Sequence, residues 1–151
     1  MLKQTRLRAR AKVCRAKANF LNHPIFLTIV NMTVLPQEIQ VWYVLPALRR
    51  EIARILIKSH GFTQKQVASV LGITEGAVSQ YLNSKRGASV KFEADIMKEI
   101  SWSAQRIAKD NSTAMEELLS LSEMDKVKTV VCKLHIAQEP SVEKTCDICF
   151  R

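Results

Sequence analysis

The sequence has no long hydrophobic run. The longest candidate, residues 20–30, is short and is interrupted by polar side chains and a proline. A membrane-spanning helix needs roughly 18 or more apolar residues in succession, so we do not expect a transmembrane protein. Because 47% of the 151 residues are nevertheless hydrophobic, the chain can build a core. We therefore expect a folded, soluble and cytoplasmic protein with one domain of ordinary size and a small appendage.

Groups suited to acid–base or nucleophilic catalysis are also scarce. The chain has only three histidines and four glycines, and it contains no glycine-rich phosphate loop. We find no Ser, His and Asp set, and no pair of carboxylates that can be assigned to one pocket. Because common enzyme mechanisms need such groups, we predict that the protein is not an enzyme.

Acidic residues are absent from residues 1–31, which carry seven Lys and Arg side chains. This segment supplies most of the net charge of +9, since residues 32–91 have a net charge of +5 and residues 92–151 of −3. An acid-free, Arg-rich start is typical of a nucleic-acid-binding arm, a targeting segment, or translated sequence upstream of the true start. We favour the last, because Met32 directly precedes the stretch in which acids and helical patterning begin. A signal peptide fits poorly, whereas an organellar transit peptide would fit the composition.

The segment LPQEIQVWYVLPALRREIARILIKSHGF predicts a strand or turn followed by a helix. Pro46 suits the first helical turn, where its missing N–H is not needed, and Gly61 suits the C-terminal cap. The apolar stripe of this helix is Leu48, Ile52, Ile55 and Leu56. Three arginines, Arg49, Arg50 and Arg54, lie off the stripe and are expected to face water or a ligand.

The next stretch, FTQKQVASVLGITEGAVSQYL, contains two short amphipathic pieces of similar length. Thr63 is a natural N-cap, and Gln66 three residues later completes a capping box, so a helix is predicted over residues 64–71. Thr74 is predicted to cap a second helix that continues to about Asn83.

The spacing within this stretch is typical of a helix-turn-helix unit, in which two helices meet at a wide angle through three or four residues. Ala68 is small enough to let the second helix cross close by, and Gly72 can adopt the positive φ that a sharp turn requires. The apolar positions predicted to pack both helices on a shared core are Val67, Leu71, Ile73, Val78 and Tyr81. A helical hairpin in a core, without a ligand, would not require both the small residue and the glycine at these positions.

The side chains predicted to face outward are mostly polar or small. Gln, Asn, Ser and Thr exchange hydrogen bonds with base edges in the major groove, where a helix fits, so we predict that this unit binds double-stranded DNA. Ser79 and Gln80 are predicted to face bases, with Glu75, Gly76 and Asn83 around them, and Thr74 completes the outward face. The predicted phosphate contacts are Gln64, Lys65, Lys85 and Arg86. Glu75 either accepts from a cytosine amine or serves only as a first-turn helix charge.

The stretch LPALRREIARILIKSHGFTQKQVASVLGITEGAVSQYLNSKRG resembles the helix-turn-helix domain of the phage lambda repressor and Cro (XRE-like) type. From about Met32 to the C-terminus, the chain is similar to a group of archaeal transcriptional regulators that combine this domain with a cysteine-containing C-terminal tail. TEGAVSQYLNSKRG is the most specific part of the resemblance. It implies a compact helical bundle that binds operator DNA.

Two further helices are predicted after this unit. One runs from Ser89 to about Lys109 and ends at KDNST, and the other begins near Thr113 and extends toward Gln138. Their apolar stripes are Phe92, Ile96, Ile100 and Ile107 in the first, and Met115, Leu118, Val127, Val130, Val131 and Leu134 in the second. We therefore predict an all-α fold, a compact helix-turn-helix bundle with C-terminal helices and a small Cys/His knuckle.

Three of the four cysteines lie in the last twenty residues and form, with one histidine, the pattern C-x-x-H, ten residues, C-x-x-C. The predicted metal ligands are Cys132, His135, Cys146 and Cys149. Three thiolates and an imidazole suit tetrahedral zinc; an iron–sulfur cluster is the less favoured alternative, because thiolate-only ligation is more usual for it. A redox dithiol, or no site at all, also fits the residues. A metal or redox site here could modulate DNA affinity.

The sequence therefore predicts a sequence-specific DNA-binding transcriptional regulator in three parts. They are a basic extension (1–31), a helix-turn-helix DNA-binding domain (32–88) and a helical C-terminal region with the Cys/His tail (89–151). Because one recognition helix reads only about four or five base pairs, we expect a homodimer on half-sites about 34 Å apart, with the helices after Ser89 as its surface. The alternative is a helix-turn-helix adaptor or recombination-associated protein that acts mainly through protein partners.

Overall fold

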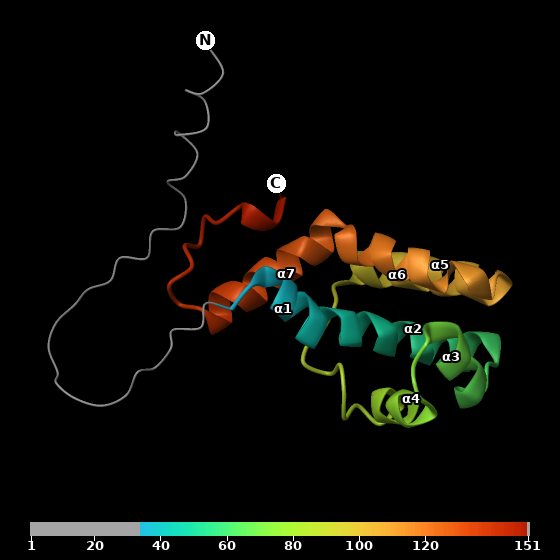
Figure 1. The fold of residues 1–151 in the computed structure, drawn as a ribbon. Helices are drawn as coiled ribbons and strands as arrows, with labels where there is room; N and C mark the ends of the chain where they lie inside the picture. The colour runs from blue at the N-terminus through green and yellow to red at the C-terminus, as the bar shows by residue number, and fades with distance from the viewer. Residues whose placement is uncertain (1–33, 151) are drawn as a thin grey trace, which may run out of the picture.

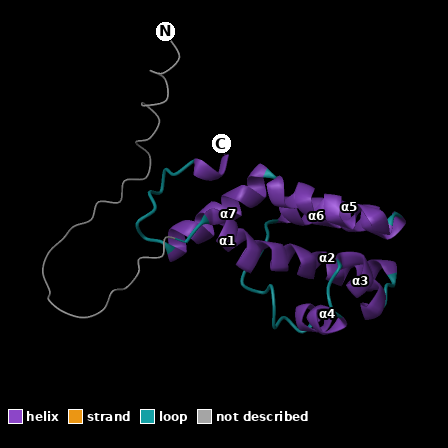
Figure 2. Ribbon diagram, viewed as in Figure 1, coloured by secondary structure: helices purple, strands orange, loops and turns teal. Residues whose placement is uncertain are grey.

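The computed structural model describes residues 34–150, and that part of the chain contains only helices and loops (Figures 1 and 2). The predicted all-α fold is thereby confirmed. The predictions for residues 1–31, which include Cys14, lie outside the described residues. Among residues 34–150, no helix combines the length and the apolar character that crossing a bilayer requires.

The first helical segments form one continuous rod (Figure 1). They are α1 (Pro36–Ile39), the π-helical segment η1 (Gln40–Val44) and α2 (Leu45–His60). The strand or turn predicted here is wrong, because residues from Pro36 onward are helical. The backbone N–H of Leu35 donates to the Glu38 carboxylate at 2.7 Å and so caps the helix start.

Side-chain burial explains why this rod overrides the strand propensity of QVWYV. Ile39, Val44, Leu48 and Ile52 are all fully buried. The step of five residues from Ile39 to Val44 matches the extra residue of a π turn, in which the N–H of Leu45 donates to the Gln40 carbonyl. The following steps of four residues match an α-helix. The π segment therefore keeps all four side chains in the same core.

The remaining elements surround α2. They are α3 (Gln64–Leu71), α4 (Glu75–Leu82), α5 (Ala94–Lys109), the 3-10 turn η2 (Asn111–Thr113), α6 (Ala114–Glu123), α7 (Asp125–Gln138) and the 3-10 turn η3 (Ile148–Phe150). Helix α2 packs against α3, α4, α5 and α6, whereas α1 packs against α7. Figure 1 shows α4 on one side of α2, with α5 and α6 on the other. The core consequently takes side chains from both sides of the domain boundary predicted at residue 88.

Two predicted helices differ from the observed ones. Helix α5 begins at Ala94 rather than Ser89, because residues before it are extended and bury Val90, which is only 4% exposed. The single helix predicted from Thr113 toward Gln138 is broken at Met124, whose φ and ψ are −60° and 135°.

The break at Met124 brings two apolar faces onto one core. Leu121 and Val127 are 2% and 0% exposed. In an unbroken α-helix, a step of six residues would leave these side chains about 120° apart around the helix axis. The break lets α6 and α7 each turn an apolar side toward the same core. Met115, predicted as part of the same stripe, is instead 79% exposed.

Candidate nucleic-acid interface

Local capping fixes the ends of α3 and α4. The hydroxyl Oγ1 of Thr63 accepts from the Gln66 N–H at 3.2 Å, and Gln66 Oε1 accepts from the Thr63 N–H at 2.8 Å. At the second helix, Thr74 Oγ1 accepts from the Ala77 N–H at 3.1 Å. Gly72 lies between the helices in the left-handed region, with a φ of 62°. These observations confirm the predicted capping box, turn glycine and second N-cap.

The two helices pack on a shared core through the predicted positions. Val67, Val78 and Tyr81 are at most 1% exposed, and Leu71 is 6% exposed. Ile73, in the turn, is half-buried. Ala68 lies at 6% exposure, where a larger side chain would separate α3 from α4. The geometry is therefore that of a helix-turn-helix unit.

The ten residues predicted to contact DNA are accessible. All are exposed except Ser79, which is half-buried and accepts a hydrogen bond from Asn83 Nδ2 at 3.4 Å. Thr74 already uses its hydroxyl as the cap of α4, so its oxygen retains one acceptor position at most. Gln80 is exposed and has no side-chain hydrogen bond to another described residue that would hold it away from a ligand. Contact of these residues with bases or phosphates stays a prediction.

Positive charge flanks the outward face of α4. Lys85 and Arg86 follow the helix and are exposed. The Arg86 guanidinium lies 5.7 Å from the centre of the Tyr81 ring, within the range of a cation–π contact. Because Tyr81 is buried in the shared core, this contact orients Arg86 relative to α4. At the start of α3, Gln64 and Lys65 add a second polar and basic edge.

The loop after α4 is attached to the N-terminal half of α2. Arg50 donates to the Gly87 carbonyl oxygen at 3.4 Å and to Ser84 Oγ at 3.5 Å. Gly87 has a φ of 70°, and a Cβ added there would lie 2.5 Å from the Pro46 carbonyl oxygen. The expectation that Arg50 faces water or a ligand is therefore wrong, since its side chain is only 12% exposed.

The role of Arg50 was not evident from the sequence. Its contact with Gly87 spans 37 residues, and no local pattern predicts a hydrogen bond at such a separation. The only signal was the glycine that follows Lys85 and Arg86, which suggested a turn but not what the turn packs against.

A sequence model of the Helix-turn-helix family, of the lambda repressor (XRE) type, matches residues 52–92. The matched residues contain the helix-turn-helix unit formed by α3 and α4. The match begins within α2, includes α3 and α4, and ends just before α5. No curated protein and no solved structure matches the chain. The matched family is a DNA-binding, non-enzymatic class of domain, and the match agrees with the predicted function in its general form.

The three C-terminal cysteines lie near one another, outside the helix-turn-helix domain. Cys132 is on α7, and Cys149 is in η3, which packs against α7. Burial, a hydrogen bond with the Cys149 thiol and the charges of Cys149 and Cys146 raise the pKa of Cys132 to about 12. The Cys132 thiol is therefore influenced by the other two cysteines, whereas the predicted four-ligand set stays a prediction.

His135 is directed elsewhere. It is 7% exposed, and its Nε2 lies 2.6 Å from the Val34 carbonyl oxygen. Because a carbonyl only accepts, Nε2 carries the proton in this bond, and Nδ1 is the nitrogen left for any other ligand. Within residues 34–150, no three His, Cys, Asp or Glu side chains are arranged to hold one metal ion. Zinc or an iron–sulfur cluster at the four predicted ligands stays a prediction, and would require the thiols to move closer together.

Proposed function

We propose that the protein is a sequence-specific DNA-binding transcriptional regulator that inserts α4 into the major groove. The observation that supports this most is the outward face of α4. It is polar, accessible and flanked by Lys85 and Arg86. A helix with such a face fits the major groove, where Gln and Asn read base edges and cations contact phosphates.

The packing of the domain gives each helix a separate role. Val78 and Tyr81 hold one side of α4 in the core, so its opposite side, with Gln80, is presented outward. The N-terminus of α3 presents Lys65 beside unpaired backbone N–H groups, an arrangement that attracts a phosphate. Arg50 holds the loop that carries Lys85, so Lys85 can supply a second phosphate contact at a fixed place.

Selection of bound sites from random duplex DNA tests this proposal with the full chain. We expect an enriched motif for the wild type, and relaxation at one base position for Gln80→Ala, since a bidentate base contact contributes about 1–3 kcal/mol of discrimination. Gln105→Ala, an exposed glutamine on α5, is the matched control and should leave the motif unchanged.

The other outcomes are equally informative. Uniform weakening with Gln80→Ala would place Gln80 at a phosphate rather than a base. Absence of any enriched motif for the wild type would overturn the proposal and favour the adaptor function, in which the main partner is a protein.

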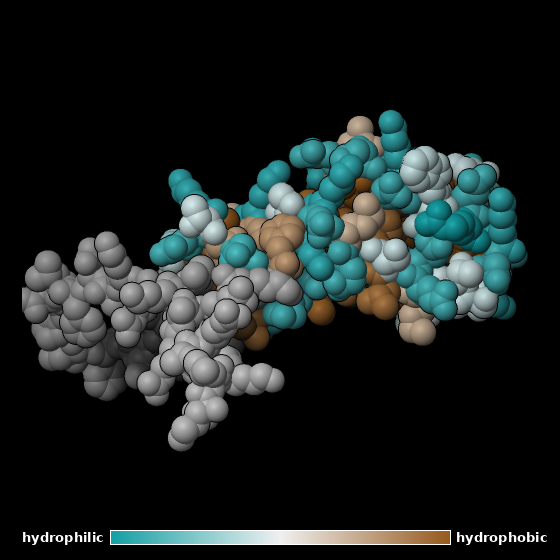
Figure 3. Space-filling view, turned by 90° about the horizontal axis from the view of Figure 1, so that it is seen from above, coloured by the Kyte–Doolittle hydropathy of each residue, from teal (hydrophilic) through white to brown (hydrophobic). Residues whose placement is uncertain are grey.

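We also propose that the regulator acts as a homodimer. Trp102 on α5 is 53% exposed, and Leu119 on α6 is 62% exposed. Seen from above, the middle of the molecule shows hydrophobic side chains between hydrophilic ones (Figure 3). Light scattering should give twice the monomer mass for the wild type and the monomer mass for Leu119→Asp. A monomeric wild type at the concentrations that bind DNA would refute the dimer.

We also propose that a metal ion or thiol chemistry at the C-terminal cysteines controls DNA binding. Cys132, Cys146 and Cys149 supply soft ligands close together, which favour zinc over a hard cation. The Val34 bond of His135 would have to yield or leave Nδ1 as the ligand atom. DNA affinity measured before and after chelation tests this part, and an unchanged affinity would exclude metal control.

A further inference from the structure

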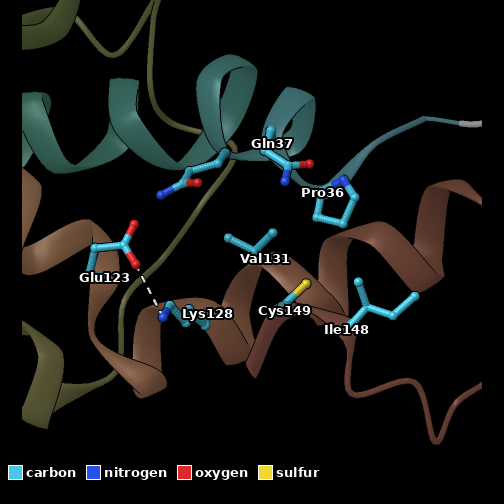
Figure 4. Close-up of a pocket in the computed structure, with 8 residues that line it drawn as sticks. Pro36, Gln37, Glu123, Lys128, Val131, Ile148 and Cys149 are labelled. Atoms are coloured by element: carbon cyan, nitrogen blue, oxygen red, sulfur yellow. Dashed lines mark ion pairs between the residues drawn. The ribbon is translucent and has the colours of Figure 1, made fainter. Parts of the chain in front are cut away.

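A cavity of about 250 Å³ lies between the N-terminal rod and the C-terminal turn (Figure 4). Its lining residues come from two distant parts of the sequence, α1 and η1 in one and α6, α7 and η3 in the other. They are Pro36, Gln37, Gln40, Glu123, Lys128, Val131, Ile148 and Cys149. The volume is below the range of about 300–1,000 Å³ typical of drug-sized ligands, so the cavity suits a smaller molecule.

The cavity wall combines apolar surface with groups that bind charge. Glu123 and Lys128 face each other with the carboxylate oxygen and Nζ 3.1 Å apart, as Figure 4 shows. The amide of Gln37 adds a donor and an acceptor elsewhere on the wall. Val131 and Ile148 supply an apolar surface. Such a wall fits a small molecule that carries both ammonium and carboxylate groups on short methylene arms.

A thiol lies at this wall. Cys149 lines the cavity, and it is close enough to the Cys132 thiol to help raise the pKa of that group. The two cysteines belong to different elements, α7 and η3, which are packed together. Two thiols side by side, one of them at a cavity, are the arrangement that undergoes stepwise thiol–disulfide exchange.

We propose that this cavity binds a low-molecular-weight disulfide of amino-acid type, which oxidises Cys149 and Cys132 to a disulfide. In the first step the Cys149 sulfur loses its proton and attacks one sulfur of the ligand. The S–S bond of the ligand breaks, and its departing half takes up a proton and leaves as a thiol. In the second step the Cys132 thiol, which is protonated until then, loses its proton as its sulfur attacks the Cys149 sulfur of the mixed disulfide, and the second half of the ligand takes up a proton and leaves as a thiol.

The overall exchange is balanced. Two protein thiols are oxidised to one disulfide, and one ligand disulfide is reduced to two thiols. No other oxidant is required. The order of the steps follows from the geometry, because Cys149 lines the cavity and Cys132 does not. The reaction does not depend on DNA binding, so it can fail or succeed independently of the proposed function.

Cystine is the probe, because it carries an ammonium and a carboxylate at each end. The full-length reduced protein is incubated with cystine and a chelator, and its disulfides are assigned by peptide mass mapping, which separates Cys14 from the other cysteines. The expected product is a Cys132–Cys149 disulfide. Cys132→Ser should stop at a cystine-derived adduct on Cys149, and Cys146→Ser should still form the Cys132–Cys149 bond.

Recognition by the cavity is tested with rates. Lys128→Gln should slow adduct formation with cystine by about tenfold, the effect of losing one charge-assisted hydrogen bond. Its rate with cystamine, which lacks carboxylates, should stay within a factor of about two of the wild-type rate. Lys133→Gln, an exposed lysine of α7 that pairs with Glu93 at 3.7 Å, is the matched control and should react as the wild type does.

Three results would overturn the inference. A Cys146–Cys149 disulfide as the main product would mean that the C-x-x-C pair, not the pair joining α7 and η3, is the redox couple. Equal rates for the native and the urea-unfolded chain would mean that the cavity contributes nothing. Equal slowing by Lys128→Gln and Lys133→Gln would remove the role assigned to the cavity lysine.

Discussion

The guanidinium of Arg50 donates to the carbonyl oxygen of Gly87 at 3.4 Å, and this bond joins α2 to the loop that follows α4. The same guanidinium lies 2.9 Å from the Glu51 carboxylate, which holds it in place. Lys85 and Arg86 are in the loop between the two residues that Arg50 contacts, Ser84 and Gly87. The position of these cations is therefore set by a residue that we do not expect to touch DNA.

Arg50→Gln should weaken DNA binding about tenfold, because a shorter neutral side chain cannot hold both contacts and the cationic loop gains freedom. The equilibrium binding constant on the selected DNA site measures the effect. Arg54→Gln is the matched control, since Arg54 is also on α2 and has only a 3.8 Å ion pair with Glu51. Equal losses for the two variants would contradict the positioning role.

Gly87→Ala should be more destabilising than Gly61→Ala by about 1–3 kcal/mol, the cost of an overpacked contact. Both glycines have a φ of 70°, so each substitution carries the left-handed penalty. Only Gly87 also brings its Cβ against the Pro46 carbonyl oxygen, whereas nothing lies within 4 Å of a Cβ at Gly61. Urea denaturation of both variants gives the difference, and equal free energies of unfolding would mean that the loop simply moves away.

Lys85→Gln should weaken binding to all DNA sequences alike and reduce the salt dependence. If Lys85 neutralises one phosphate, the slope of log K against log salt concentration should become shallower by about 0.9. Lys109→Gln, an exposed lysine at the end of α5, should leave the slope unchanged. A shift in the preferred sequence with Lys85→Gln would instead mean that this lysine reads a base.

Stability should fall in acid partly through Glu117. Its carboxylate accepts from Arg106 Nε at 2.5 Å and Nη2 at 2.7 Å, and this hydrogen bonding keeps the pKa of Glu117 below its usual value. A lowered folded-state pKa stabilises the folded protein above the unfolded-state pKa, and this contribution is lost as the pH falls through the folded-state pKa. The free energy of unfolding should therefore drop less between pH 7 and acid in Glu117→Gln than in the wild type. Glu116→Gln, an exposed neighbour, should behave as the wild type.

The Cys146→Ser variant should lose zinc binding but keep the thiol–disulfide exchange. If the four predicted ligands hold zinc, the reduced protein should bind one ion per chain, and Cys146→Ser should greatly weaken that binding. The Cys132–Cys149 disulfide should form regardless of this substitution. Isothermal titration with zinc, alongside the cystine reaction, separates the two. Full zinc affinity in Cys146→Ser would exclude the predicted ligand set.

The parts of the fold that were predicted correctly from the sequence are those set by neighbouring residues. The bounds of α3 follow from the capping box at Thr63 and the glycine at position 72, and both signals act within one helical turn. The same holds for Thr74 and α4. Because helix caps and turn glycines need no distant partner, their effects are visible in the sequence.

The parts that were missed depend on distant contacts. The residues of QVWYV favour a strand by propensity, yet burial of Ile39 and Val44 holds them in a helix. The break at Met124 follows from the core that Leu121 and Val127 share. These outcomes require the assembled core, which no local pattern contains.

For the candidate sites, too, the features set by neighbouring residues were predicted and those set by distant contacts were missed. The polar, exposed face of α4 was predicted from spacing alone. The partner of His135 was not, because Val34 lies 101 residues away in the chain. The cavity was missed entirely, since its lining residues lie at both ends of the described chain.

The π-helical segment Gln40–Val44 is a place where the chain can lose one residue without breaking the helix. A π turn holds one residue more than an α turn, so a deletion of one amino acid here could be absorbed as ordinary α-helix. The core would survive, because residues four apart share a helix face. Because Ile39 would then lie four residues before Val44, it would keep its place in the core, and Gln37 would keep its direction relative to α2. A one-residue deletion in this segment should therefore leave the core, the cavity wall and the helix content nearly intact, whereas a deletion of one residue within α2 would turn the residues before it by about 100°.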